Sequence, residues 1–291
     1  MTDLQVERLP ELHDAVVVVA FAGWNDAASA ATDAARFIVR RLGARKFASI
    51  DPERFYDFTD SRPTVQIDPS GKRSVGWPTN EFFYARNPVG PHDVVIGIGA
   101  EPNLAWRTFA GCHTQLYTDV GAGLVVSLGA LLADVPHTRP TRVTGTAIDP
   151  MVATRLDLTT SRYQGPTGIV GVIHDTLRQQ SVPAASLWAN VPHYITTSQN
   201  PAATAALLIR LQELLGLTFD LRELETARER FVAEVDSALG ASPEVADYVR
   251  RLEVAADDPS QQQTDEELPE GQDVVLDVEA FLRLQRSEGD E

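Results

Sequence analysis

The first two thirds of the chain alternate between two hydrophobic patterns. The run at residues 15–21 is apolar throughout, and the run at 93–98 is apolar after Asp93. Both are rich in Val and Ile, which predicts strands buried on both faces of a sheet. Apolar residues three or four positions apart within residues 25–42 and 168–179 predict amphipathic helices. The repeated strand–helix order predicts an α/β fold, in which helices cover both faces of a mostly parallel sheet.

The same patterns place the other elements of this domain. They predict strands at residues 46–50, 124–132, 141–147 and 185–195, and helices at residues 104–120, 150–156 and 201–215. By periodicity the run at 124–132 fits either a strand or a helix, and its Val-rich start favours a strand first. Residues 64–85 differ, because they predict a hairpin that turns at Asp68-Pro69-Ser70-Gly71, followed by a strand at residues 82–85. This hairpin region, residues 64–85, makes the predicted sheet mixed.

From Leu217 onward the pattern is helical, and it predicts four parts for the whole chain. These are an α/β domain at residues 1–216, a helical hairpin at 217–254, an acidic flexible linker at 255–272 and a short amphipathic helix at 273–291. The hairpin either packs on the α/β domain or projects from it as a surface for a partner. The last helix either docks on its own protein or is captured by a partner.

Composition and charge narrow the classes of partner. The 291 residues are 43% hydrophobic, and the formal net charge is −16, of which −10 falls within residues 255–291. Because no basic stripe is present, we expect neither nucleic acid nor an anionic membrane as a partner. We find no run of about 20 apolar residues and no signal-peptide pattern. A single cysteine, Cys112, excludes an internal disulfide and suits a cytoplasmic protein.

Five loops follow predicted strands or precede helices in positions where a doubly wound sheet binds its ligands. If the strands are parallel, the loops meet at one edge of the sheet. The candidate ligand pocket that they predict contains Trp24, Asn25, Asp26, Glu101, Asn103, Asp149, Thr167, Gly168, His193 and Tyr194.

Most of these side chains also have a structural alternative. Asn25 or Asp26 could cap the helix that follows, and Asp149 before a proline is typical of a helix start. Glu101 could instead act as a general base or bind a ribose hydroxyl. His193 could be an ordinary loop histidine. We expect Trp24 to lie in the core, together with Trp188, rather than to stack on a ligand.

The segment "GPTGIVG" at residues 165–171 is the most specific local signal. Thr167 is placed to cap the helix that begins there, and the free N–H groups of such a terminus favour an anion. The spacing is neither the dinucleotide pattern nor a Walker loop. The alternative is that Gly168 and Gly171 allow the helix to approach the sheet closely.

The sequence predicts no specific catalytic machinery. The six histidines show no metal-binding spacing, and there is no Gly-x-Ser-x-Gly motif. Cys112 and His113 are neighbours on a predicted helix, so their side chains point about 100° apart and do not form a dyad. The candidate loops contain no basic residue to hold a phosphate, which argues against nucleoside phosphorolysis. We therefore predict no metal and no cofactor, and we name no catalytic residue.

Five motifs in a fixed order resemble the proteasome assembly chaperone 2 family, in its actinobacterial branch. They are "GWNDA" at residue 23, "GAEPN" at 99, "YQGPTGIVGVI" at 163, and "PAASLWANVPHY" at 183 before "NPAATAALL" at 200. The resemblance covers residues 15–216, and the helical region to about residue 254 also fits.

The resemblance implies a fold similar to that of purine nucleoside phosphorylases, a three-layer α/β/α sandwich around a mixed sheet with an added helical hairpin. It implies no catalytic residues, and the nucleotide-binding residues that an ATP-grasp-like label would require are not evident. Eukaryotic relatives act as heterodimeric chaperones of proteasome α-subunits, partly through a C-terminal motif that ends in Tyr and one further residue. This chain ends in Ser287-Glu288-Gly289-Asp290-Glu291, which lacks that motif.

Two functions remain open. The first is a non-catalytic assembly or interaction factor that binds protein partners or associates with itself. The alternative is a protein or enzyme that binds a small nucleoside-like or anionic ligand at the strand ends.

Overall fold

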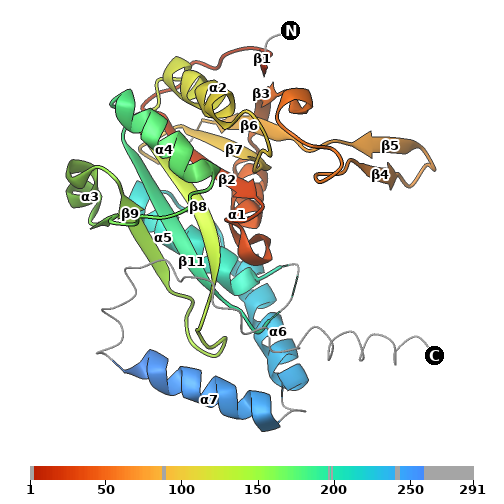
Figure 1. Ribbon diagram of the computed structural model, residues 1–291, viewed down its shortest axis with the longest axis vertical. Coiled ribbons are helices and arrows are strands. Elements are labelled where there is room, and N and C mark those ends of the chain that lie inside the picture. Colours follow the sequence, from red (N-terminus) through yellow and green to blue (C-terminus); the bar gives the residue numbers. More distant parts are fainter. Residues whose placement is uncertain (1–2, 87–89, 196, 198, 240–242, 259–291) are drawn as a thin grey trace.

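A computed structural model describes residues 3–86, 90–195, 197, 199–239 and 243–258. A sheet of nine strands crosses this part of the chain in the order β1-β3-β6-β7-β2-β8-β11-β9-β10 (Figure 1). Its strands are β1 (Leu4–Val6), β2 (Val16–Ala22), β3 (Arg45–Ile50), β6 (Asn80–Ala85), β7 (Val94–Ala100), β8 (Leu124–Ala133), β9 (Val143–Ala147), β10 (Thr159–Thr160) and β11 (Ala184–Pro192). A separate pair consists of β4 (Thr64–Ile67) and β5 (Arg73–Gly76).

Seven α-helices accompany the strands in the described residues. They are α1 (Ala30–Leu42), α2 (Trp106–Asp119), α3 (Pro150–Leu156), α4 (Ile169–Gln179), α5 (Pro201–Leu215), α6 (Arg222–Leu239) and α7 (Pro243–Asp257). Two short 3-10 turns, η1 (Ala27–Ser29) and η2 (Pro52–Arg54), follow β2 and β3. The predicted strand–helix order is confirmed, and the ambiguous run at 124–132 is a strand.

The sheet is mixed, as predicted, and its parallel part lies in the centre. Strands β7, β2, β8 and β11 run parallel to one another. On one side β6, β3 and β1 are joined by antiparallel pairings, and on the other side β9 is antiparallel to β11. The carboxyl ends of the four central strands therefore share one edge, whereas β9 ends at the opposite edge.

The central strand β2 shows why the fold has three layers. Side chains alternate across a strand, so Val16, Val18 and Ala20 face α1 and α5, whereas Val17 and Phe21 face α2 and α4. All five are buried because helices cover both faces of the sheet. This explains the uninterrupted apolar run that predicted the strand.

The first helix begins later than its pattern predicts. We expected a helix from residue 25, but α1 starts at Ala30, after the η1 turn. The reason is local, because Ala28 and Ser29 have positive φ values of 49° and 53°, which interrupt the helix. The carboxylate of Asp26 then accepts a hydrogen bond from the Ala31 N–H at 2.7 Å and so caps the true helix.

The hairpin β4–β5 projects from the body as an arm (Figure 1). Its tip is the predicted turn, in which Asp68 accepts hydrogen bonds from the N–H groups of Ser70 and Lys72, both at 2.9 Å. Gly71 has a φ of 83°, which a residue with a Cβ rarely adopts. At the base of the arm the rings of Phe58 and Trp77 lie 4.8 Å apart.

The helical hairpin forms a satellite core with the end of β11. Tyr194 and Ile195 pack there against Phe231 and Val235 of α6 and against Val249 and Leu252 of α7. Helix α7 continues to Asp257, three residues into the predicted acidic linker. The remaining predictions for the linker and the last helix concern residues 259–291, which lie outside the described residues.

Candidate functional site

The loops after β2 and β7 meet the start of α4, as the strand-end argument predicts. Glu101 follows β7, and its Oε1 accepts a hydrogen bond from the backbone N–H of Ile169, the first residue of α4, at 2.7 Å. The backbone N–H of Glu101 donates to Ala22 of β2 at 2.8 Å. A carboxylate is stabilised at a helix N-terminus by the free N–H groups and the helix dipole. Glu101 therefore caps a helix that begins 68 positions later.

Asn25 and Gly168 complete this contact. A Cβ on Gly168 would lie 2.3 Å from Asn25 Nδ2 and 2.8 Å from Glu101 Oε1, so only glycine permits the approach. Asn25 is 6% exposed, and its Nδ2 has no hydrogen-bond partner among the described residues. The close-packing alternative for Gly168 is thus the one that the structure supports.

Thr167 does not cap α4. The N-cap position is Gly168, without a side-chain cap, and Glu101 supplies the acceptor instead. The hydroxyl of Thr167 lies over Gly171, where an added Cβ would come within 2.0 Å of it. Thr167 itself is exposed.

Asp26 serves α1 instead of a ligand. It is buried, and besides capping Ala31 it accepts a hydrogen bond from the Thr32 hydroxyl at 2.6 Å. Burial raises the pKa of Asp26 above its ordinary value, and the hydrogen bonds from Thr32 and Ala31 act against that rise. The structure therefore bears out the capping alternative.

A shallow depression of about 560 Å³ lies between the ends of β2 and β7. Its described lining is Ala22, Gly23, Asp60, Ser61, Ala100, Glu101, Pro102, Asn103 and Trp106. Asn103 holds one wall, because its Oδ1 accepts from Ser61 Oγ at 3.0 Å and its Nδ2 donates to Asp60 at 2.7 Å. Of the predicted pocket residues, Glu101 and Asn103 line this depression.

Trp24 is not in the core. Its side chain is 64% exposed at the same edge of the sheet, which corrects the expectation from the sequence. Trp188 is half-buried, and an added Cβ on Gly129 of β8 would come within 2.2 Å of its ring. The sequence did not separate these two tryptophans, although Trp24 follows β2 and Trp188 lies within β11.

Asp149 lies at the opposite edge of the sheet from Glu101. It follows β9, which runs antiparallel to β11, so the two carboxylates do not meet. Asp149 Oδ1 accepts from the Met151 N–H at 2.8 Å and caps α3. The structural alternative for Asp149 therefore holds, and its assignment to the candidate pocket was wrong.

His193 and Tyr194 belong to a second cluster. Strands β8 and β11 extend beyond the end of β2. Asp26, just after β2, forms a β-bridge with Ala130 of β8, whereas the backbone N–H of His193 donates to the carbonyl of Ala133 at the end of β8. Three residues of strand place the second cluster about 10 Å further along. The residues that we predicted to form a single pocket therefore fall into two separate clusters, and Asp149 caps a helix at the opposite edge of the sheet.

His137 is the centre of the second cluster, and no sequence signal marked it. Its Nε2 lies 3.0 Å from Asp236 Oδ1 on α6, and its Nδ1 lies 2.7 Å from the Tyr194 hydroxyl. Because an ionised Asp236 only accepts, Nε2 donates to it and Nδ1 accepts from Tyr194. The same hydroxyl accepts from the His137 backbone N–H at 2.8 Å. Burial raises the pKa of Tyr194 to about 12.

Further polar contacts join the body to α7. His193 Nδ1 lies 3.0 Å from Asp134, and its Nε2 lies 3.4 Å from the hydroxyl of Tyr248. Arg139 pairs with Asp257 at 2.7 Å. These partners are 55 to 118 positions apart in the chain, so local sequence patterns do not predict them. The second cluster holds the helical hairpin in place.

Two buried histidines lie outside both clusters. His113 is enclosed by the rings of Phe21, Phe82 and Phe109, and burial lowers its pKa to about 3. His174 contacts Ser127 Oγ at 2.8 Å, and burial lowers its pKa to about 4. Both rings are therefore neutral parts of the core at neutral pH.

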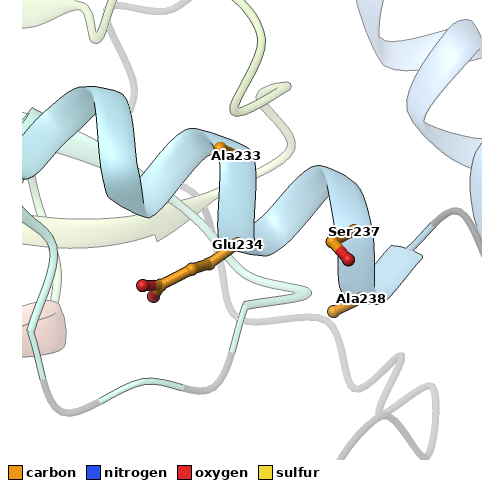
Figure 2. Close-up of a pocket in the computed structure, with 4 residues that line it drawn as sticks. All are labelled: Ala233, Glu234, Ser237 and Ala238. Atoms are coloured by element: carbon orange, nitrogen blue, oxygen red, sulfur yellow. The ribbon is translucent and has the colours of Figure 1, made fainter.

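A second hollow, of about 420 Å³, lies beside the end of α6. Figure 2 shows its described lining, which is Ala233, Glu234, Ser237 and Ala238, all from this one helix. A single helix supplies one wall only, so these residues alone do not enclose a ligand.

Within the described ranges, no group of three or more His, Cys, Asp or Glu side chains could hold a metal ion. No described helix combines the length and apolar character that a bilayer crossing requires.

The family follows from a comparison of the sequence with protein-family models. The model of the PAC2 family matches residues 20–239, which is most of the chain. The chain belongs to the PAC2 family. This confirms the resemblance drawn from the five motifs, and the matched span includes Glu101, His137 and α6 of this PAC2 protein.

Solved structures of the PAC2 family share the fold. A PAC2 family protein from Streptomyces avermitilis is 43% identical, with a TM-score of 0.75, and the match covers 81% of this chain and all of the other. The Mycobacterium tuberculosis proteasome-assembly chaperone homologue Rv2125 is 39% identical, with a TM-score of 0.73, and the match covers 80% of this chain and 99% of that one.

A more distant neighbour shows only the common fold. Pyrococcus furiosus PbaB, described as an archaeal proteasome activator, is 18% identical, with a TM-score of 0.65, and the match covers 81% of this PAC2 chain and 99% of PbaB. No curated protein matches the chain.

Proposed function

We propose that this PAC2 protein is a cytoplasmic, non-catalytic interaction or assembly factor that also associates with itself. One observation carries the proposal: the carboxylates of the candidate pocket have structural roles. Glu101 caps α4, Asp26 caps α1 and Asp149 caps α3. A carboxylate that holds a helix terminus would have to break that contact to act on a substrate, at the cost of helix stability.

The helical hairpin supports the same proposal, because it offers a built surface. Its inner side is fixed to the body by the second cluster, and its outer side on α6 carries the exposed residues Arg228, Glu229 and Arg230. The names of the relatives suggest the class of partner, since Rv2125 is called a proteasome-assembly chaperone homologue and PbaB a proteasome activator. We propose proteasome subunits or their associated factors as the partners.

An affinity purification tests this role. The tagged full chain is recovered from a lysate of the organism that encodes it, in parallel with a variant carrying Arg228→Ala, Glu229→Ala and Arg230→Ala, and both are compared by quantitative mass spectrometry. We expect proteasome components with the wild type and a loss of them with the variant. Recovery of the bait alone from both samples would contradict the assembly role.

A second candidate function rests on the buried amide of Asn25. Its Nδ2 has no partner among the described residues, and it lies beside Gly168, as does Glu101, which lines the depression of about 560 Å³. A small ligand with an acceptor group could satisfy this donor. A thermal-shift screen with nucleosides, nucleotides and phosphate tests it, since a ligand at about 100 times its Kd adds about 2.7 kcal/mol of stability. No shift across the panel would count against this second function.

A further inference from the structure

The arm β4–β5 has one apolar and one polar face. Val65 pairs with Val75, and Ile67 pairs with Arg73, so these side chains share a face, while Gln66 and Ser74 point the other way. Val65, Ile67 and Val75 are 50%, 70% and 50% exposed. An apolar face of this kind on a projecting element marks an interaction surface.

The arm lacks the support that a two-stranded sheet needs. An isolated hairpin in water is at best marginally stable, and stability requires a third strand or packing against another element. The nine-stranded sheet does not include the arm, which extends away from it (Figure 1). Contact with another surface would bury the apolar face and stabilise the arm.

The turn of the arm is already ordered before any such contact. Asp68 accepts hydrogen bonds from Ser70 and Lys72, and the backbone N–H of Gly71 donates to the Asp68 carbonyl at 2.8 Å. Hydrogen bonds from the Ser70 hydroxyl and the Lys72 N–H, the two largest causes, lower the pKa of the Asp68 carboxyl. A preformed turn reduces the conformational entropy lost on binding.

Charge indicates what covers the apolar face. Residues 62–77 contain Arg62, Lys72 and Arg73 against the single acid Asp68, a net charge of +2. The chain as a whole carries −16, of which −10 falls within residues 255–291, so residues 1–254 outside the arm carry −8. The three cations are exposed and make no ion pair within the described residues. The body of a second copy of this chain therefore has a net charge opposite to that of the arm.

We propose that the arm docks through its apolar face, with Arg73 on that face, onto the acidic body of a second copy of this chain. The contact rests on the self-association that the proposed function includes, and it assigns a surface to it. Apolar burial supplies the attraction, and the cations of the arm orient it against the partner copy.

The mass of the full chain in solution tests the proposal. Multi-angle light scattering and sedimentation equilibrium compare the wild type with Val65→Asp/Ile67→Asp, and with the matched control Gln66→Asp/Ser74→Asp on the polar face. We expect the wild type above 31.8 kDa, the mass of one chain. The apolar-face variant should raise the Kd of self-association at least about tenfold, whereas the control stays within about twofold of the wild type.

A photo-crosslinking residue in place of Ile67 gives a second readout that does not depend on the charge change. We expect a product of twice the chain mass, and fewer such products as salt is raised, because ion pairing at the surface is screened. A circular dichroism spectrum and melting curve like those of the wild type show that each variant is folded.

The outcomes separate the arm from self-association itself. A wild type that stays at the mass of one chain at about 100 µM overturns both the self-association and the arm proposal, and the arm then binds another protein. An oligomeric wild type whose mass does not change with Val65→Asp/Ile67→Asp overturns the arm proposal alone. If the affinity purification recovers no proteasome components with the wild type, the result for the arm is unaffected.

Discussion

The carboxylate of Glu101 accepts a hydrogen bond from the backbone N–H of Ile169 at 2.7 Å. This contact joins the carboxyl end of the central strand β7 to the first residue of α4, across an interval that includes five other elements. A residue that sequence analysis places in a candidate ligand pocket therefore acts first as a helix cap.

We expect Glu101→Ala to lower the free energy of unfolding by about 1–2 kcal/mol, because the N-terminus of α4 loses its acceptor and its negative charge. Glu101→Gln keeps an acceptor and should cost about half as much. Urea denaturation checks both values. Glu229→Ala, at an exposed site on α6, is the control and should change stability by less than about 0.5 kcal/mol. Equal losses from Glu101→Ala and Glu229→Ala would contradict the capping role.

Gly168→Ala tests the close approach of α4 to Asn25. The added Cβ would lie 2.3 Å from Asn25 Nδ2, and the resulting overpacking should cost about 1–3 kcal/mol. Gly111→Ala is the matched control within α2, where an added Cβ has no neighbour within 4 Å. It should stabilise the protein by up to about 1 kcal/mol, since alanine favours a helix. The two changes should shift the midpoint of thermal unfolding in opposite directions.

Tyr194→Phe should loosen the helical hairpin. Without the hydroxyl, His137 Nδ1 and the His137 backbone N–H lose a buried partner, at a cost of about 1–3 kcal/mol. Hydrogen exchange should become faster in α6, near Asp236, while the strands β2 and β7 keep their protection. Tyr163→Phe, which removes an exposed hydroxyl bonded to Pro166, is the control. Unchanged exchange in α6 would show that His137 does not hold the hairpin.

Stability should fall as the pH is lowered from 7 to 5. His113 and His174 have pKa values lowered to about 3 and about 4, so in this range the unfolded chain binds protons that the folded one does not. The stability that the two neutral histidines contribute is therefore present above the unfolded pKa of 6.5 and is lost below it. Between pH 7 and pH 5 the free energy of unfolding should fall by about 4 kcal/mol for the two groups together. The raised pKa of Asp26 acts in the opposite direction.

Replacing His113 isolates its share of this pH dependence. The double variant His113→Phe/Tyr117→Phe removes the buried ring nitrogens and their hydrogen-bond partner together, so no polar atom is left unpaired. The change in unfolding free energy between pH 7 and pH 5 should drop by about half. An unchanged pH profile in urea denaturation would mean that His113 is accessible to protons in the folded state.

Local signals in the sequence predicted most of the elements but not their contacts. The Val run of β2, the turn at Asp68 and the start of α3 after Asp149 each depend on residues close together in the chain. The candidate pocket required the direction of every strand, and β9 runs against its neighbour β11. Periodicity contains no information on direction, which is why Asp149 was assigned to the wrong edge.

The second cluster shows a different limit. His137 and Asp236 are 99 positions apart, and each is an ordinary polar residue in its own segment. Their contact depends on β8 and β11 extending beyond β2, which only the assembled sheet determines. Trp24 shows the opposite case. We expected an aromatic residue after a buried strand to lie in the core, but the turn at Gly23 leaves the Trp24 side chain exposed.

The arm also affects how the family can diversify. It is inserted between β3 and β6, which pair with each other through Ile50 and Asn80, so residues 62–78 can lengthen or shorten without shifting the register of the sheet. Each doubling of such a loop costs only about 0.6 kcal/mol of closure entropy. Mutation in one exposed segment can therefore give a descendant a new binding partner, while selection on the remaining chain continues to preserve its fold.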